Sequence, residues 1–224
     1  MGEEMSVDIS RALKTVGVQG FGHVYYPWLA EQAQTRELIV EIGSWLGGSA
    51  RAMADNTAGT LFCVDPWTGP EKSEGVVPGG DPKLWEERGH DPEWVWKAFQ
   101  ENMEGLDNVI PMRMTSLEGA RWLRNLRFDM IFLDANHSYE NAKADLLAWR
   151  PLLAPGGLLC GHDWGWQSGS KTLTDAVMET GGGHRIGVDS LWIGDRNGSN
   201  YGCRWRRIYR LSLVSGTFET RSRS

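Results

Sequence analysis

The sequence predicts an α/β protein with a doubly wound, mostly parallel β-sheet of seven strands. Short apolar runs alternate with helix-like segments five times along the chain, as in sheets that carry helices on both faces. Several of these runs end in a carboxylate or a histidine, and ligands of such sheets bind at the carboxyl ends of the strands. A last pair of runs near the C-terminus is typical of an antiparallel strand pair.

The 224 residues are enough for one domain with a substantial core. We assign residues 37–215 to this domain, residues 1–36 to a helical preface before it, and residues 216–224 to a disordered tail. Gly, Pro, Lys and Glu dominate residues 66–92, and such a long loop in a compact domain is either a functional lid or a disordered insertion. Its place beside the first strand ends makes it lid-like in our interpretation.

Charge and apolar patterning restrict the partners. The net charge of −6 argues against nucleic acid as the main partner. No apolar run approaches the length that spans a bilayer, and the acidic N-terminus lacks a signal-peptide pattern. Cys63 and Cys160 lie in apolar runs, which fits small buried side chains in a reducing compartment. We therefore expect a cytoplasmic protein without a membrane partner.

The first strand and the turn after it are the strongest signal in the chain. Residues 37–42 are largely apolar, residues 43–49 are rich in glycine, and a helix pattern follows to about residue 56. Such a unit brings backbone N–H groups and a helix N-terminus to a ligand. The second strand, residues 60–65, ends in Asp65 about twenty residues after the turn, a spacing that suits a carboxylate bound to a ribose diol.

Three further strands are each followed by a helix. Strands and helices occupy, in order, residues 108–112 and 117–126, 128–134 and 139–150, and 158–161 and 170–180. A helix over residues 93–103 precedes them, Ser116 is placed to cap the next helix, and residues 155–157 form a glycine turn. The terminal antiparallel pair comprises residues 191–193 and 206–213.

Polar side chains gather at the predicted strand ends. They are Glu41, Asp65, Ser116, Asp134, His137, His162 and Asp163. Because the carboxyl ends of parallel strands meet at one edge of the sheet, we expect a single site there. Residues 25–28, Tyr-Tyr-Pro-Trp, are candidates to cover one side of it.

Four motifs in this order resemble class I S-adenosylmethionine-dependent methyltransferases. They are EIGSWLGGS at residues 41–49, VDPW at 64–67, FLDANHSYE at 132–140, and PGG at 155–157 with GHDW at 161–164. The resemblance covers residues 37–195 and is nearest to the macrocin-type O-methyltransferases of antibiotic and sugar tailoring. It implies a Rossmann-like methyltransferase fold and an enzyme that methylates a hydroxyl of a small-molecule acceptor with S-adenosyl-L-methionine.

The resemblance also implies a cofactor site. Its residues are Glu41, Gly43, Ser44, Gly47 and Ser49 at the methionine part, Asp65 at the ribose, and Trp67 and Ser116 near the adenine.

Relatives in this branch often bind a divalent cation, and the matching residues are Asp134, His162 and Asp163. The tailoring enzymes usually have two acids, or an acid and an amide, at the last two positions, so His162 opens the site to a cation softer than magnesium. Methyl transfer needs an in-line approach and a nucleophilic oxygen, which a cation and a base can provide. His137 is our candidate base beside Asp134; a helix cap or a backbone hydrogen bond is its alternative role.

Two other functions remain open at this point. An NAD(P)-dependent oxidoreductase also has a glycine turn and a second-strand acid, but here Trp45 stands where the dinucleotide motif requires its second glycine. A non-catalytic adenosyl-cofactor-binding protein would keep the fold without needing Asp134, His137 and Asp163. The expected partners are a small-molecule acceptor and, as an alternative left open, further copies of the chain in a homo-oligomer.

Overall fold

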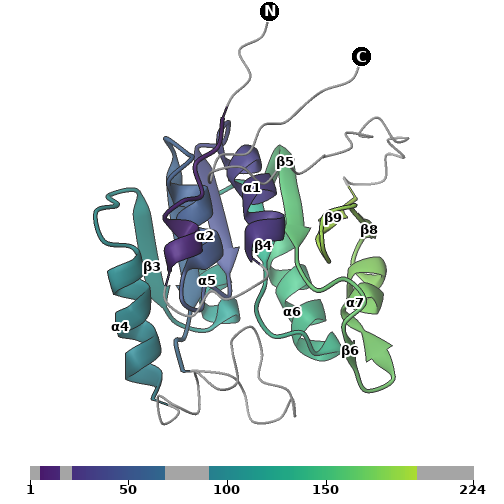
Figure 1. The fold of residues 1–224 in the computed structure, drawn as a ribbon. Helices are drawn as coiled ribbons and strands as arrows, with labels where there is room; N and C mark the ends of the chain where they lie inside the picture. Colours follow the sequence, from purple (N-terminus) through teal and green to yellow (C-terminus); the bar gives the residue numbers. More distant parts are fainter. Residues whose placement is uncertain (1–5, 16–21, 69–90, 196–224) are drawn as a thin grey trace, which may run out of the picture.

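A computed structural model of the chain describes residues 6–15, 22–68 and 91–195. One seven-stranded sheet lies between two layers of helices (Figure 1), so the predicted fold class is confirmed. Most of the predicted lid-like loop, the strand at 206–213 and the tail at 216–224 lie outside the described residues. None of the described helices is both long and apolar enough to cross a bilayer.

The sheet has the strand order β3-β2-β1-β4-β5-β9-β8. The first five strands of this order pair in parallel, and β9 and β8 are antiparallel to their neighbours. The bounds are β1 Leu38–Ile42, β2 Thr60–Asp65, β3 Val109–Arg113, β4 Phe128–Leu133, β5 Leu153–Gly161, β8 Gly183–Arg185 and β9 Trp192–Gly194. The chain winds outward from β1 in one direction and from β4 in the other, so the ends of these two strands form the switch point where ligands of such sheets bind.

Among the described residues, three helices cover each face of the sheet. On one face lie α1 Gly22–Ala33, α2 Gly48–Ala54 and α4 Pro92–Asn102, and on the other α5 Ser116–Trp122, α6 Tyr139–Trp149 and α7 Leu173–Glu179. Short 3-10 helices also form at Ala12–Lys14 and Arg150–Leu152. The alternation of side chains along β4 divides the core: Met130 and Phe132 join the first layer, and Ile131 and Leu133 the second.

Two local details correct the sequence prediction. Thr115, not Ser116, caps α5, because its hydroxyl accepts the Glu118 N–H while the Glu118 carboxylate accepts the Thr115 N–H at 3.0 Å. Ser116 is the first helical residue, which leaves its hydroxyl for another partner. Residues 155–157 are no turn before a strand but part of β5, whose register against β4 shifts between Phe128 and Met130.

The antiparallel end of the sheet has an unexpected member. Strand β9 pairs with β5 on one side and with β8 on the other. An antiparallel pair therefore exists at this end of the sheet, but it joins β9 to β8, and the predicted partner at residues 206–213 lies outside the described residues. The sequence of β8, Gly-His-Arg, is too short and too polar for its pattern to predict a strand.

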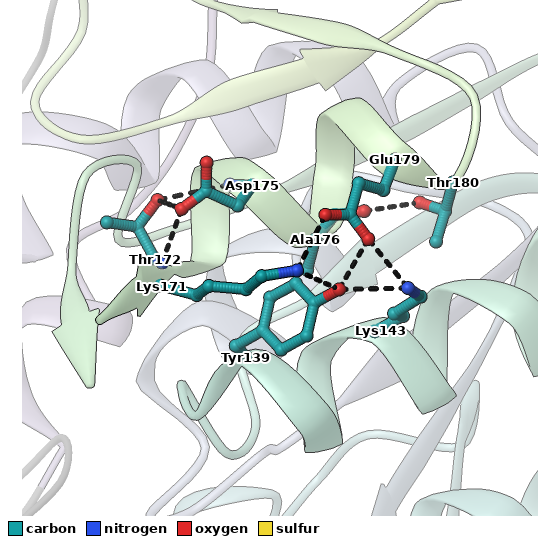
Figure 2. A network of polar contacts seen from close by, with 8 residues as sticks. All are labelled: Tyr139, Lys143, Lys171, Thr172, Asp175, Ala176, Glu179 and Thr180. Carbon is teal, nitrogen blue, oxygen red and sulfur yellow. Dashed lines mark hydrogen bonds and ion pairs between the residues drawn. The ribbon is translucent and has the colours of Figure 1, made fainter. Parts of the chain in front are cut away.

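A polar network ties the start of α6 to α7 and to a hairpin formed by β6 Gln167–Ser168 and β7 Lys171–Thr172 (Figure 2). The Tyr139 hydroxyl accepts hydrogen bonds from Lys143 and Lys171, at 2.9 Å each, and donates one to Glu179. The Glu179 carboxylate also pairs with both lysines, at 2.6 and 2.9 Å. Since the tyrosine is buried and the three charges stay half-hydrated, the network fixes the hairpin without burying an ion.

Candidate active site

The ends of four adjacent strands bring the predicted polar residues together. Glu41 is the next-to-last residue of β1 and Asp65 the last residue of β2, and Asp134 and His162 directly follow β4 and β5. Backbone hydrogen bonds continue past the strand ends, from Gly43 N to Val64 O and from Asp134 N to Ile42 O, each at 2.9 Å. The chain is therefore still in register where the polar side chains begin, which fixes their spacing.

The conformation of the glycine turn after β1 is determined within the protein, independently of any ligand. Gly43 has a φ of +89°, and a Cβ there would lie 2.2 Å from the Asp134 carbonyl oxygen. Gly47 has a φ of +85°, and its Cβ would lie 2.7 Å from the Met103 methyl group. Both positions thus favour glycine before any ligand is considered, Gly43 because its Cβ would meet the backbone after β4 and Gly47 because of its positive φ.

Asp65 holds the same turn from the next strand. Its two carboxylate oxygens accept the Trp45 N–H at 2.9 Å and the Trp67 N–H at 2.6 Å. Burial raises the pKa of Asp65, although these backbone hydrogen bonds act in the opposite direction. A carboxylate has about four lone-pair positions, so Asp65 can still accept hydrogen bonds from a diol.

Glu41 is fully buried beside the turn. The Ser49 hydroxyl donates a 2.5 Å hydrogen bond to it, but burial outweighs this bond and raises the pKa of Glu41 to about 8. The Ser44 hydroxyl is also buried and makes no hydrogen bond of normal geometry to any described residue. A buried acid whose ionisation a cation would favour, with a buried hydroxyl beside it, fits a ligand that carries both a cation and a carboxylate.

The two residues expected near an adenine have partners within the protein. Trp67 is fully buried, its indole N–H donates to the Trp45 carbonyl at 2.7 Å, and its ring packs against Phe99 at a centroid distance of 4.5 Å. The Ser116 hydroxyl donates to Asp145 at 2.5 Å and accepts from the Trp149 indole at 2.9 Å. Contact of Trp67 and Ser116 with a cofactor therefore stays a prediction.

Two histidines and two aspartates form a compact cluster beside the turn. His137 Nε2 lies 2.8 Å from Asp163 Oδ2 and 3.4 Å from Asp134 Oδ1, and His162 Nδ1 lies 3.2 Å from the same Asp163 oxygen. Burial would lower the pKa of His137, but its hydrogen bonds to Asp134 and Asp163 prevail and raise it to about 10. In the same way Asp163 and Asp134 raise the pKa of His162 to about 9. The two imidazolium groups hold the pKa of Asp163 well below its usual range despite burial.

The cluster has the donor atoms of a cation site. Asp134, His162 and Asp163 each offer one ligand atom, and these atoms all lie within 4.8 Å of one another. Two carboxylate oxygens and an imidazole nitrogen suit a first-row divalent cation better than calcium. The three residues predicted as metal ligands thus lie together, and His137 stands beside them as a cation that must lose its proton before it can act as a base.

Two further polar residues belong to this site, and no pattern in the sequence indicated them. Asp189 Oδ2 and Ser190 Oγ each lie 3.1 Å from His162 Nε2. They come from the turn between β8 and β9, which no sequence pattern placed at the strand ends. Two aromatic rings flank the cluster: Tyr25 lies against His162 at a centroid distance of 4.5 Å, and the 39%-exposed Trp166 lies 5.8 Å from the His137 ring.

Comparison with known proteins identifies a family to which this chain is related. A protein-family profile described as a methyltransferase domain matches residues 40–164, which include the glycine turn, Asp65, Asp134, His162 and Asp163. No curated protein sequence matches the chain.

Three solved structures with a similar fold can be compared. A protein of Corynebacterium glutamicum is 18% identical with a TM-score of 0.56, over 87% of this chain and 91% of that chain. A putative O-methyltransferase from Klebsiella pneumoniae is also 18% identical, with a TM-score of 0.57 over 85% and 90%. The TDP-rhamnose 3′-O-methyltransferase CalS11, from calicheamicin biosynthesis, is 16% identical with a TM-score of 0.51 over 78% and 77%. At these identities the likeness concerns the fold.

Proposed function

The chain belongs to the methyltransferase-domain family, and on that premise we propose that it transfers a methyl group from S-adenosylmethionine to a hydroxyl of a small-molecule acceptor. Family membership confirms the predicted class of enzyme, a class I methyltransferase that depends on S-adenosylmethionine, and argues against the dehydrogenase alternative. The observation that carries the proposal is the Asp134–His137–Asp163 cluster, which lies at the same edge of the sheet as the glycine turn.

The glycine turn and the first two strand ends are the proposed cofactor site. S-adenosylmethionine, when bound, supplies a methyl group on a positively charged sulfur. Glu41 would face its ammonium group, and the Ser44 hydroxyl and the N-terminus of α2 would bind its carboxylate. Asp65 would accept hydrogen bonds from its ribose with the lone pairs that the turn leaves free.

The histidine–aspartate cluster is the proposed acceptor end of the site. Asp134, His162 and Asp163 would hold a divalent cation, which lowers the pKa of a hydroxyl bound to it. His137 lies between the carboxylates, so a cation that neutralises them would also lower the pKa of His137 and let it accept the acceptor's proton. Two of the similar structures carry the name O-methyltransferase, and a sugar-like hydroxyl is the acceptor we favour.

The test combines cofactor binding with turnover. Calorimetry with S-adenosylmethionine and with NADH should give binding heat for the first cofactor alone. A panel of sugar, polyketide and phenolic hydroxyls should then yield methylated products detected by mass spectrometry. Asp134→Asn should reduce turnover by roughly 100-fold or more and leave cofactor binding intact, whereas Asp195→Asn on the β8–β9 hairpin should change neither. Binding of NADH alone would refute the proposal, and tight cofactor binding without any turnover would favour the non-catalytic alternative.

A further inference from the structure

The turn between β8 and β9 reaches into the cluster through one carboxylate, that of Asp189. We propose that Asp189 is a positioning residue, which holds the Nε2–H of His162 and thereby directs Nδ1 toward Asp163 and the candidate cation. The proposal rests on the proposed function, since it concerns how the candidate cation site is held in place.

The geometry around His162 defines which nitrogen can carry which role. Nε2 lies 3.1 Å from Asp189 Oδ2, while Nδ1 lies 3.2 Å from Asp163 Oδ2. Both nitrogens face carboxylates, which accept hydrogen bonds, so both can carry a proton while no cation is bound. A cation held beside Asp163 would take the place of the Nδ1 proton, and the Nε2–H would stay on Asp189. Histidine ligands of metals are commonly oriented by a carboxylate in this manner.

Two further contacts oppose rotation of the His162 ring out of this arrangement. The Tyr25 ring lies against it at a centroid distance of 4.5 Å, with 35° between the ring planes. The Ser190 hydroxyl lies 3.1 Å from Nε2 and gives the same nitrogen a second polar neighbour. A carboxylate on one edge and an aromatic ring on one face together fix both the tilt and the tautomer of the imidazole.

Asp189 itself is held by contacts that do not involve His162. Its φ is +47°, a left-handed conformation that aspartate tolerates better than most residues. The Arg185 guanidinium donates two hydrogen bonds to the Asp189 carbonyl, at 3.1 and 2.7 Å. The Ser190 carbonyl accepts the Trp164 N–H at 2.9 Å, which ties the turn to the segment after Asp163. The carboxylate is therefore presented to the ring by a preformed turn.

The same hairpin carries a second aspartate–histidine pair that serves as an internal comparison. His184 Nδ1 lies 3.5 Å from Asp195 Oδ1, and both side chains are more than half exposed. The His162–Asp189 pair is shorter and much less exposed, with 14% and 30% of the side chains accessible. If both pairs only stabilised the hairpin, replacing Asp189 and replacing Asp195 would have the same effect on the His162 Nε2–H and on cobalt affinity.

The experiment uses Asp189→Gly, which removes the carboxylate and keeps the positive φ, with Asp189→Asn as the conservative variant and Asp195→Asn as the matched control. In the protein without metal, ¹⁵N-histidine NMR should show a His162 Nε2–H that is protected from exchange. We expect the signal to persist in Asp189→Asn and in the control, and to disappear in Asp189→Gly. Cobalt(II), followed by its visible absorption, should then bind roughly 10- to 100-fold more weakly to Asp189→Gly, with a smaller loss in Asp189→Asn.

The outcomes separate this proposal from the one it rests on. A protected Nε2–H in Asp189→Gly would overturn the positioning role whether or not the protein binds a metal, and so would wild-type cobalt affinity in that variant. If wild-type protein binds no cobalt, the cation in the proposed function fails, and the NMR signal still decides the role of Asp189. If Asp189→Gly does not fold, as judged by circular dichroism, a protected Nε2–H in Asp189→Ala would overturn the proposal instead.

Discussion

Replacing Glu41 with glutamine tests how the buried acid beside the glycine turn serves the cofactor. Burial raises the pKa of Glu41 from 4.5 to about 8, so at pH 7 most of the protein holds this carboxyl in its neutral form. The ammonium group of S-adenosylmethionine would favour the charged form. Binding at pH 7 should therefore release roughly half to one proton per cofactor from Glu41.

The assay is calorimetric titration at pH 7 in two buffers of different ionisation enthalpy, since the difference in observed heat counts the protons released. The amino group of the cofactor is already largely protonated at that pH and contributes little. Glu41→Gln should abolish the release, and Glu37→Gln, an exposed position before the same strand, should keep it. Equal heats in both buffers for the wild type, or an unchanged release in Glu41→Gln, would refute the assignment of Glu41 to the cofactor ammonium.

Three further predictions concern stability and metal dependence. Burial raises the pKa of Asp145 from 3.8 to about 6, so its ionisation destabilises the folded protein as pH rises from about 4 through 6. In urea unfolding, Asp145→Asn should therefore raise the free energy of unfolding by about 2–3 kcal/mol at pH 7 and leave it unchanged at pH 4. Gly43→Ala should lose at least about 3 kcal/mol, because its Cβ would meet the Asp134 carbonyl at 2.2 Å. Gly105→Ala, with a similar φ and open space around it, should lose only about 1–2 kcal/mol; equal losses would show that backbone conformation, not the contact, decides. A chelator should abolish turnover and leave the affinity for S-adenosylmethionine within about 2-fold, and chelator-resistant turnover would remove the metal from the mechanism.

The predictable part of the molecule follows from periodicity. The strands β1, β2 and β4 are largely apolar and mostly buried, and each has an acidic residue within one position of its last residue, so sequence alone placed Glu41, Asp65 and Asp134 at one edge. Alternation of strands and helices predicted the doubly wound sheet, and the structure then gave the order of the strands in it.

The unpredicted part depends on contacts between short or distant segments. Asp189 reaches His162 across a hairpin of three-residue strands, and segments of that length have no period to recognise. Thr115 and Ser116 are adjacent hydroxyl residues, either of which can cap a helix, and tertiary packing decides: Asp145 and Trp149 of α6 occupy the Ser116 hydroxyl. The ionisation of His137 was equally invisible, because it arises from carboxylates on two different strands.

The network around Tyr139 has a consequence for the loops beside the cluster. His137 stands two residues before Tyr139, and Trp166 stands at the start of the hairpin that Lys171 ties to the same tyrosine (Figure 2). The two loops that flank the cluster on this side are thus linked through one phenol ring and two ammonium groups. A movement of the hairpin would therefore act on the Lys171–Tyr139 hydrogen bond, which lies two residues from His137 in the chain.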